Sequence, residues 1–190
     1  FMKDGIIIVN KPAGKTSHQI VSQVRKTLNI KKVGHCGTLD PMAEGVLVVL
    51  VGRGTKLSDL LLCQDKQYIA EMTFGIQTDT LDTTGAVLRT ANVNLTPALI
   101  EGALSKFRGS IEQIPPMYSA IKIHGQKLYQ LARKGREVER PARQITIREL
   151  ELLEPAPTGD LRLRIRCSKG TYVRTLCHDI GQALGCGAVM

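Results

Sequence analysis

Two stretches of this sequence alternate between apolar and polar residues, which restricts both to strands that bury one face. In 67–76 the apolar positions are Tyr68, Ala70, Met72, Phe74 and Ile76. In 161–167 four apolar residues alternate with Arg162, Arg164 and Arg166. Because successive side chains of a strand point to opposite faces, we expect the apolar sets to face a core and the arginines to face solvent.

Other segments indicate strands and helices in mixed order. Further strands are predicted over Gly5–Asn10, Val46–Val51 and Arg143–Leu153. Helices are predicted after three capping signals, at Thr16 or Ser17, at Thr96-Pro97 and at Thr171, since each precedes apolar residues at helical spacing. The order lacks a regular βαβ rhythm, so the predicted class is α+β, a mostly antiparallel mixed sheet flanked by helices.

The chain carries a positive charge that is concentrated in one segment. Lys and Arg number 26 and Asp and Glu 17, giving a net charge of +9, and the stretch from Ser119 to Arg148 contributes +6 of it. Clustered cations suit a polyphosphate partner, because each neutralised phosphate releases counterions. The alternative is a solvated basic loop and helix face. With no Trp and 4% aromatic residues, a broad stacking platform for single strands is disfavoured.

Cysteine usage and hydropathy indicate the compartment. The five cysteines are odd in number and form no CxxC pair, which favours a reduced chain. No apolar run has the length of a membrane span, and we expect a cytoplasmic protein without membrane contact.

The most unusual stretch is Gly34–Gly45, GHCGTLDPMAEG, a sharply shaped loop that precedes a predicted buried strand. Asp40 precedes Pro41, which favours an extended backbone and restricts where the carboxylate points. An Asp-Pro pair among glycines is also typical of a plain turn, so Asp40 by itself is an ambiguous candidate.

Three other features stand beside this loop. A second rigid basic turn, Asn10–Ser17, joins a strand to a helix, and Tyr68 begins the alternating strand. The segment Ser168–Leu176 is expected to place Tyr172 and Arg174 in the first turn of a helix. The helix dipole favours anions at that end, so Arg174 is expected to have a carboxylate partner.

Metal and nucleotide sites receive little support. His35-Cys36 and Cys177-His178 lack the ligand spacing of a zinc site. The stretch Asp79–Gly85 lacks the alternating ligands and distal Glu of a calcium loop, and a structural turn is the better interpretation. Gly52–Lys56 is too short for a phosphate-binding Walker loop.

Together these segments resemble one family. The order KPAGKTS, GHCGTLDPMAEGVL, QYIAEMTFGIQTDTLDTTG, IPPMYSAIKIHGQKLY and CSKGTYVRTLCHDIGQALGCGA is similar to that of the TruB-type tRNA pseudouridine-55 synthases. The resemblance runs from about Gly5 to Ala188, and it implies the pseudouridine synthase fold. It also implies an enzyme that converts a uridine in the T stem-loop of tRNA to pseudouridine, without a cofactor or metal.

The resemblance implies roles for individual residues. Asp40 matches the family nucleophile, which attacks a uridine flipped out of the RNA. Arg174 resembles the arginine that pairs with this aspartate. Tyr68 resembles the tyrosine that stacks on the base and accepts the final proton. His35 resembles the histidine that fills the space of the flipped base, and Tyr172 a residue lining the uracil pocket. Taken alone, Tyr68 and Tyr172 could be core residues, and His35 a loop cap.

Further positions are expected to support the site or to bind RNA. Lys11 and Pro12 resemble a turn that braces the catalytic loop, and Lys56 and Asp82 are counted as supporting residues. The basic segment at about 120–143 corresponds to the family's RNA-clamping insertion. Its predicted RNA-backbone contacts are Lys122, Lys127, Arg133, Lys134, Arg136 and Arg143.

The expected organisation is a single catalytic domain over residues 5–190 that contains this insertion. The C-terminal RNA-binding domain of bacterial members is expected to be absent from this chain. We expect a monomer with no obligate protein partner. Two other functions compete with this one: a tRNA-binding module without turnover, and a pseudouridine synthase for a different RNA.

Overall fold

The computed structural model describes residues 3–123, 125–156 and 160–190, so His124 of the basic segment lies outside the described residues. The chain divides into two compact units, Phe1–Gln64 and Asp65–Met190. Within the described ranges, no helix has both the length and the apolar character that a membrane crossing requires. The assignment of one catalytic domain stays a prediction.

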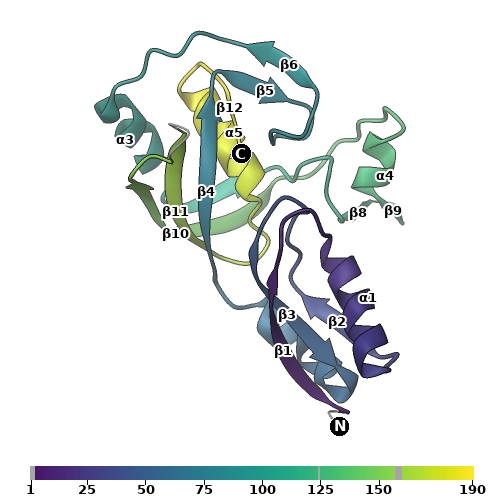
Figure 1. The fold of residues 1–190 in the computed structure, drawn as a ribbon. Helices are drawn as coiled ribbons and strands as arrows, with labels where there is room; N and C mark the ends of the chain where they lie inside the picture. The colour runs from purple at the N-terminus through teal and green to yellow at the C-terminus, as the bar shows by residue number, and fades with distance from the viewer. Residues whose placement is uncertain (1–2, 124, 157–159) are drawn as a thin grey trace. The chain divides into compact units, whose positions relative to one another are not determined.

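The first unit is a three-stranded antiparallel sheet with a helix on one face (Figure 1, purple to blue). Its strands are β1 (Gly5–Lys11), β2 (Val33–Cys36) and β3 (Gly45–Val51), in the order β1-β3-β2. The helices are α1 (Ser17–Leu28), the 3-10 helix η1 (Gly52–Leu57) and α2 (Ser58–Leu62). The core contains Ile20, Val21, Val33, Leu47, Val49 and Val51. This sheet places the loop with Asp40 between β2 and β3.

The second unit is built on a five-stranded antiparallel sheet in the order β12-β4-β11-β10-β7. These strands are β4 (Lys66–Phe74), β7 (Gly109–Gln113), β10 (Arg143–Leu153), β11 (Leu161–Cys167) and β12 (Ala188–Val189). Helices α3 (Pro97–Ser105) and α5 (Val173–Ala183) contribute Leu104, Leu176 and Ile180 to the same buried cluster as the sheet. This packing fixes the position of α5, the helix that carries Arg174.

Two hairpins and a short helix complete the second unit (Figure 1). One hairpin pairs β5 (Ile76–Thr78) with β6 (Val87–Thr90). The other pairs β8 (Lys122–Ile123) with β9 (Gln126–Lys127) and leads into α4 (Leu128–Ala132). Leu128 and Leu131 of α4 are buried, so the basic segment carries its own apolar anchor.

The predicted α+β class with a mostly antiparallel sheet is confirmed, because every strand pairing in the described chain is antiparallel. The predicted helix start at Thr16 is also confirmed: its side chain accepts from the amide of Gln19, whose own side chain bonds back to Thr16. Arg164 and Arg166 of β11 face outward as predicted and form ion pairs of 2.8 and 3.1 Å with Glu151 and Glu149.

Three sequence-based boundaries are wrong. The alternating strand ends at Phe74 rather than at Ile76, because Gly75 has φ +81° and its added Cβ would lie 2.7 Å from the Ala91 carbonyl oxygen. His35 and Cys36 lie in β2 rather than in the loop that carries Asp40.

The predicted cap at Thr171 is the third error. The N-cap residue of α5 is Tyr172, and its side chain makes no capping hydrogen bond to the helix. The Thr171 hydroxyl instead donates to the carbonyl of Ser168 at 3.0 Å, closing the turn that contains Gly170. Thr171 is therefore used by the turn and is not available to the helix.

Candidate active site

The backbone on both sides of Asp40 is held by the Lys11–Ser17 turn. Before Asp40, the Ser17 hydroxyl donates to the Leu39 carbonyl at 3.1 Å and accepts from the Leu39 amide at 3.0 Å. After it, the Pro41 carbonyl accepts from the Gly14 amide at 2.8 Å and from Lys11 Nζ at 3.2 Å. A partly exposed aspartate is thus carried on a backbone that has little freedom to move.

Lys11 is fully buried, and each of its ammonium protons has an acceptor. Besides Pro41, Nζ donates to the carbonyls of Pro12 at 2.9 Å and Lys15 at 2.7 Å. Burial lowers the pKa of Lys11, and the nearby Asp40 and Glu44 carboxylates oppose that shift. Lys11 therefore ties its own turn to the Asp40 loop and also places a positive charge within electrostatic range of Asp40. Pro12 itself is exposed and contributes its carbonyl and its rigid backbone.

His35 and Lys56 lie elsewhere in the first unit. His35, half-buried in β2, places Nδ1 2.7 Å from the carbonyl of Gly37, so that nitrogen must carry the proton. This bond fixes the tautomer and leaves Nε2 as the acceptor in the neutral ring. Lys56 is exposed in η1.

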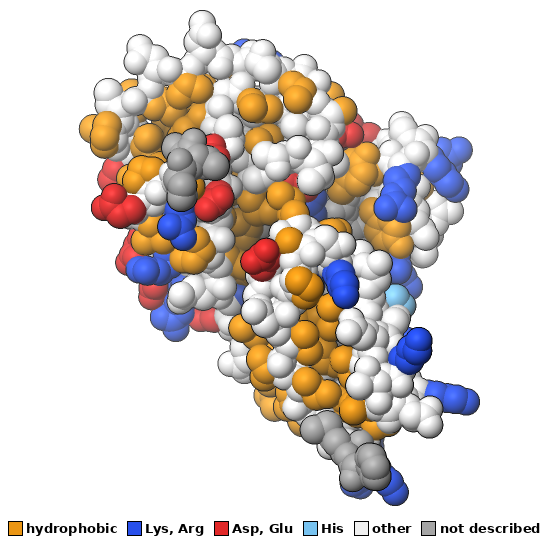
Figure 2. Space-filling model, viewed as in Figure 1, with side chains coloured by type: hydrophobic (Ala, Val, Ile, Leu, Met, Phe, Trp, Pro, Cys, Tyr) orange, Lys and Arg blue, Asp and Glu red, His pale blue; other side chains and the backbone are white. Residues whose placement is uncertain are grey.

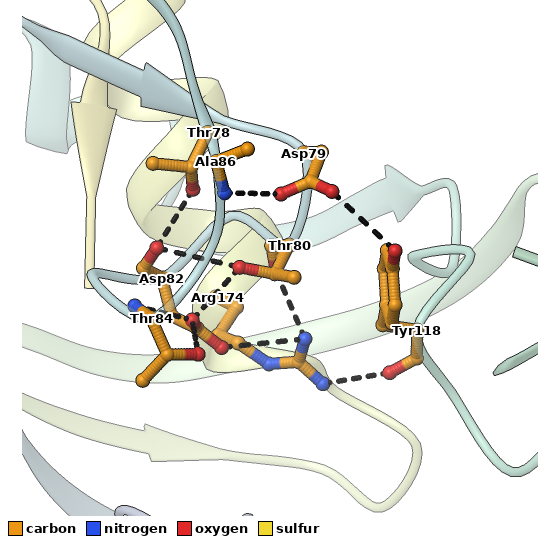
Figure 3. A network of polar contacts seen from close by, with 8 residues as sticks. All are labelled: Thr78, Asp79, Thr80, Asp82, Thr84, Ala86, Tyr118 and Arg174. Atoms are coloured by element: carbon orange, nitrogen blue, oxygen red, sulfur yellow. Dashed lines mark hydrogen bonds and ion pairs between the residues drawn. The ribbon is translucent and has the colours of Figure 1, made fainter. Parts of the chain in front are cut away.

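The second unit holds a buried polar network around Arg174 (Figure 3). The guanidinium donates from Nη1 to the Thr80 carbonyl and from Nη2 to the Tyr118 carbonyl, both at 2.9 Å. Its Nη1 lies 3.7 Å from Oδ2 of Asp82, and the side chains of Arg174 and Asp82 are only 6% and 8% exposed. Asp82 thus provides a carboxylate partner for this first-turn cation. The pairing of Arg174 with Asp40 stays a prediction.

Asp82 also organises the turn that carries it. Its Oδ1 accepts from the Thr80 hydroxyl at 2.8 Å, the Thr84 amide at 3.0 Å and the Thr84 hydroxyl at 2.6 Å. The Thr78 hydroxyl donates to its carbonyl at 2.7 Å. The Asp79–Gly85 stretch is therefore a closed structural turn, as expected, and the described residues contain no group of three His, Cys, Asp or Glu side chains suited to a metal.

Two residues of this region were not predicted. Tyr118 accepts from Arg174 through its carbonyl, and its hydroxyl lies 3.4 Å from Oδ2 of Asp79. Burial and the Asp79 carboxylate raise the pKa of Tyr118. Gln113, at the end of β7, bonds to the backbone of Tyr172. Both lie in or next to the IPPMYSA motif, but their partners are more than 38 residues away, so spacing gave no signal for these contacts.

The two tyrosines assigned to the base lie in the second unit. Tyr68, on β4 opposite Ile165, is half-buried and packs against the main core cluster. Tyr172 is half-buried at the start of α5, two residues before Arg174.

Two cations of the basic segment lie beside one aromatic ring. Lys127 Nζ and the Arg133 guanidinium lie 5.6 and 5.4 Å from the centre of the Tyr129 ring. Lys122 and Arg143 are among the residues that line an adjoining groove of about 660 Å³. Lys134 and Arg136 are exposed after α4, and Figure 2 shows basic side chains gathered on this side of the surface, at the right of the view.

The chain matches the model of the TruB family pseudouridylate synthases, N-terminal domain, over residues 25–173. It is 54% identical over 187 residues to tRNA pseudouridine synthase B of Alkaliphilus oremlandii, covering 98% of this chain and 62% of the relative. It is 50% identical to that of Francisella philomiragia, covering 97% and 61%. The chain thus spans about three fifths of the length of these relatives. For that of Protochlamydia amoebophila, at 52% identity, the shares are 97% and 70%.

Solved structures give the same result. A Cbf5–Nop10–Gar1 complex contains a chain that matches with a TM-score of 0.75 at 33% identity, covering 99% of this chain and 46% of that one. An H/ACA RNP bound to a substrate RNA containing 2′-deoxyuridine gives a TM-score of 0.70 at 30% identity, with shares of 98% and 44%. On its sequence and its fold, this chain belongs to the TruB family of pseudouridylate synthases.

Proposed function

We propose that this chain isomerises a uridine in the T stem-loop of tRNA to pseudouridine, with Asp40 as the nucleophile. The carboxylate attacks the flipped-out nucleotide, the bond from the ribose to N1 of uracil breaks, and the ring turns. A bond from C5 to the ribose then forms, the carboxylate is released, C5 loses its proton and N1 takes one up. The reaction rearranges one nucleotide without net oxidation or reduction, so the isomerisation requires no redox cofactor.

The observation that carries this proposal is the restraint of Asp40. Leu39 and Pro41, its two neighbours, are held by Ser17, Gly14 and Lys11. A nucleophile must meet its target atom in one geometry, and holding the backbone in advance lowers the entropic cost of attack. A plain surface turn would have no need of a fully buried lysine with three acceptors.

The remaining roles are part of the same proposal. Arg174 is the charge partner of the nucleophile. Its bonds to the carbonyls of Thr80 and Tyr118 and its ion pair with Asp82 hold the guanidinium in a set orientation. Tyr68 stacks on the base and accepts the last proton, and Tyr172 contacts the uracil.

The proposal also assigns roles to three positions of the first unit. His35 fills the space that the flipped base leaves. Pro12 and Lys56 support the site, Pro12 through the turn whose carbonyls receive Lys11.

RNA binding is assigned to the basic segment. Its cations would contact phosphates of the T stem-loop, and the Tyr129 ring limits the motion of Lys127 and Arg133. We further propose that the chain acts in the cytoplasm as a monomer, without the protein partners named for the Cbf5 complexes.

The test is single-turnover pseudouridine formation on tRNA with saturating enzyme. Asp40→Asn keeps the size of the side chain but removes the anion, so the rate should fall by at least about 10³-fold while tRNA binding is retained. Glu44→Gln is the matched control, because it removes a carboxylate from the same loop at an exposed position. It should retain the rate.

Two results would count against the proposal. Substantial turnover by Asp40→Asn would remove the nucleophile assignment. A wild-type chain that binds tRNA but forms no pseudouridine, at this or any other uridine, would favour the binding module.

A further inference from the structure

The start of α5 lacks the side-chain capping bond that helices usually have at the N-cap residue. Its N-cap residue, Tyr172, is extended at φ −103° and ψ 109°, and no side-chain bond from that residue caps the helix. The first turn holds no acidic residue and contains Arg174, which the helix dipole disfavours. Tyr172 and Arg174, both assigned to the site, thus begin a helix whose entry must be held by another part of the chain.

Gln113, on β7, bonds to the backbone at the start of α5. Its Oε1 accepts from the Tyr172 amide at 2.8 Å, and its Nε2 donates to the Tyr172 carbonyl at 3.1 Å. The two bonds can form together in only one orientation of the carboxamide, which settles its oxygen and nitrogen positions. Gln113 is 3% exposed and lies on the same strand face as Ile111, which packs on the core. A polar residue thus occupies a core-facing position of the strand.

The carboxamide copies the pairing that an antiparallel strand would give. One residue's N–H and C=O are both satisfied by a single side chain with one acceptor and one donor at fixed spacing. A methionine of similar length offers neither group, and an ionised glutamate offers only acceptors. Asparagine is shorter by one methylene and would not span the same distance.

We propose that Gln113 is a positioning residue for the isomerisation: it clamps the Tyr172 backbone and thereby sets the direction of the Tyr172 ring and of the Arg174 guanidinium. This inference rests on the proposed function of the site. Residues 172 and 174 lie within one turn, so a shift of the clamped peptide is transmitted to both side chains. Catalytic rates respond steeply to such shifts, since about 1 Å of misplacement costs on the order of 100-fold.

The test compares Gln113→Met with Gln144→Met. Gln144 lies on β10, in the strand that pairs with β7, and its Nε2 donates to the Ser110 hydroxyl at 3.0 Å on the exposed face. Both changes remove one carboxamide from the same pair of strands, but only the first releases α5. We expect Gln113→Met to lower the saturating single-turnover rate by roughly 10- to 100-fold with tRNA affinity within about threefold, and Gln144→Met to change neither.

A purely structural role gives a different result. It would lower the melting temperature of Gln113→Met but leave the saturating rate of the folded protein within about twofold of wild type, and that outcome overturns the proposal. If Gln113→Met fails to fold, Gln113→Asn decides, because it keeps a neutral carboxamide that is one methylene too short to make both bonds. Its rate should lie between those of wild type and the level predicted for Met, and a wild-type rate would be contrary to the proposal.

A second measurement separates this inference from the proposed function. Amide hydrogen exchange, followed by NMR, should show the Tyr172 amide protected in wild type and exchanging at least about tenfold faster in Gln113→Met. Unaltered exchange at Tyr172 would refute the clamp even in a chain that turned over no RNA. A protected amide in an inactive wild-type chain would instead refute the proposed function and leave the clamp standing.

Discussion

Replacing Asp82 by Asn perturbs the Arg174 network at a carboxylate that is buried together with the guanidinium. The side chain keeps its size, and the amide oxygen can take the place of Oδ1 toward Thr80 and Thr84. The NH₂ group then occupies the place of Oδ2 beside Arg174, where a donor faces a cation. The substitution therefore removes one charge, keeps the acceptor for Thr80 and Thr84, and places an NH₂ group beside the guanidinium.

The expected cost follows from these contacts. Three hydrogen bonds to an ionised group become neutral ones, which weakens each by roughly 0.5–1 kcal/mol. Loss of the buried ion pair adds about 1–2 kcal/mol, toward the low end because the pair is long and Arg174 retains two carbonyl acceptors. The neutral amide avoids the desolvation cost of the buried carboxylate, which offsets part of this sum. The free energy of unfolding should fall by about 2–4 kcal/mol.

Asp79→Asn is the matched comparison. Asp79 lies in the same turn and is exposed, and the amide oxygen of an asparagine could still accept from the Ala86 amide, now bonded to Oδ1 at 2.8 Å (Figure 3). Its cost should be below about 1 kcal/mol. The assay is urea denaturation at neutral pH, with the two variants compared by their midpoints at equal slope.

The saturating turnover rate gives a second observable, because only Asp82→Asn should disturb the orientation of Arg174 and slow the reaction. Equal destabilisation by the two substitutions would refute the reasoning, since burial of the charge would then have no energetic consequence. An Asp82→Asn variant as stable as wild type would refute it as well.

Two further predictions concern charge elsewhere in the second unit. Burial raises the pKa of Asp179 to about 6, so between pH 4 and 6 the folded state holds a proton that the unfolded state has lost, and stability falls as pH rises through this window. Asp179→Asn should therefore stabilise the chain at pH 8 by on the order of 2 kcal/mol and lose that gain near pH 4, measured by urea denaturation at both pH values; a gain independent of pH would contradict this. In the basic segment, joint replacement of Lys127, Arg133, Lys134 and Arg136 by Gln should weaken tRNA binding and reduce the slope of log K against log salt by up to about 4. The same change at Arg162 and Arg164, whose guanidinium groups lie 3.7 and 2.8 Å from the carboxylates of Glu71 and Glu151, should leave the slope nearly unchanged, and an unaltered slope in the first variant would mean a solvated face.

Local chemistry was sufficient wherever one segment decides its own structure. The alternation in 161–167 required a two-faced strand, and the Thr16 cap required a helix start, since both signals arise from neighbours within a few residues. The family motifs likewise identified Asp40, Tyr68 and Arg174 as candidates, because each motif is contiguous in the sequence.

Tertiary structure decided the features that depend on distant partners. Gly75 ends β4 because the Ala91 backbone passes close to it, and Thr171 is lost to the Ser168 turn. A carboxylate beside Arg174 comes from Asp82, 92 positions earlier in the chain, and the carboxamide that bonds to the Tyr172 backbone comes from Gln113.

The physical reason is the same in these cases. A buried polar group must find a partner, and the nearest partner is set by how strands and helices pack rather than by spacing along the chain. The sequence by itself therefore determined which residues are candidates for the chemistry, the secondary structure of its strongly patterned segments and the fold class. Which partners hold those residues in place became evident only after the β7, β10 and α5 segments had packed together.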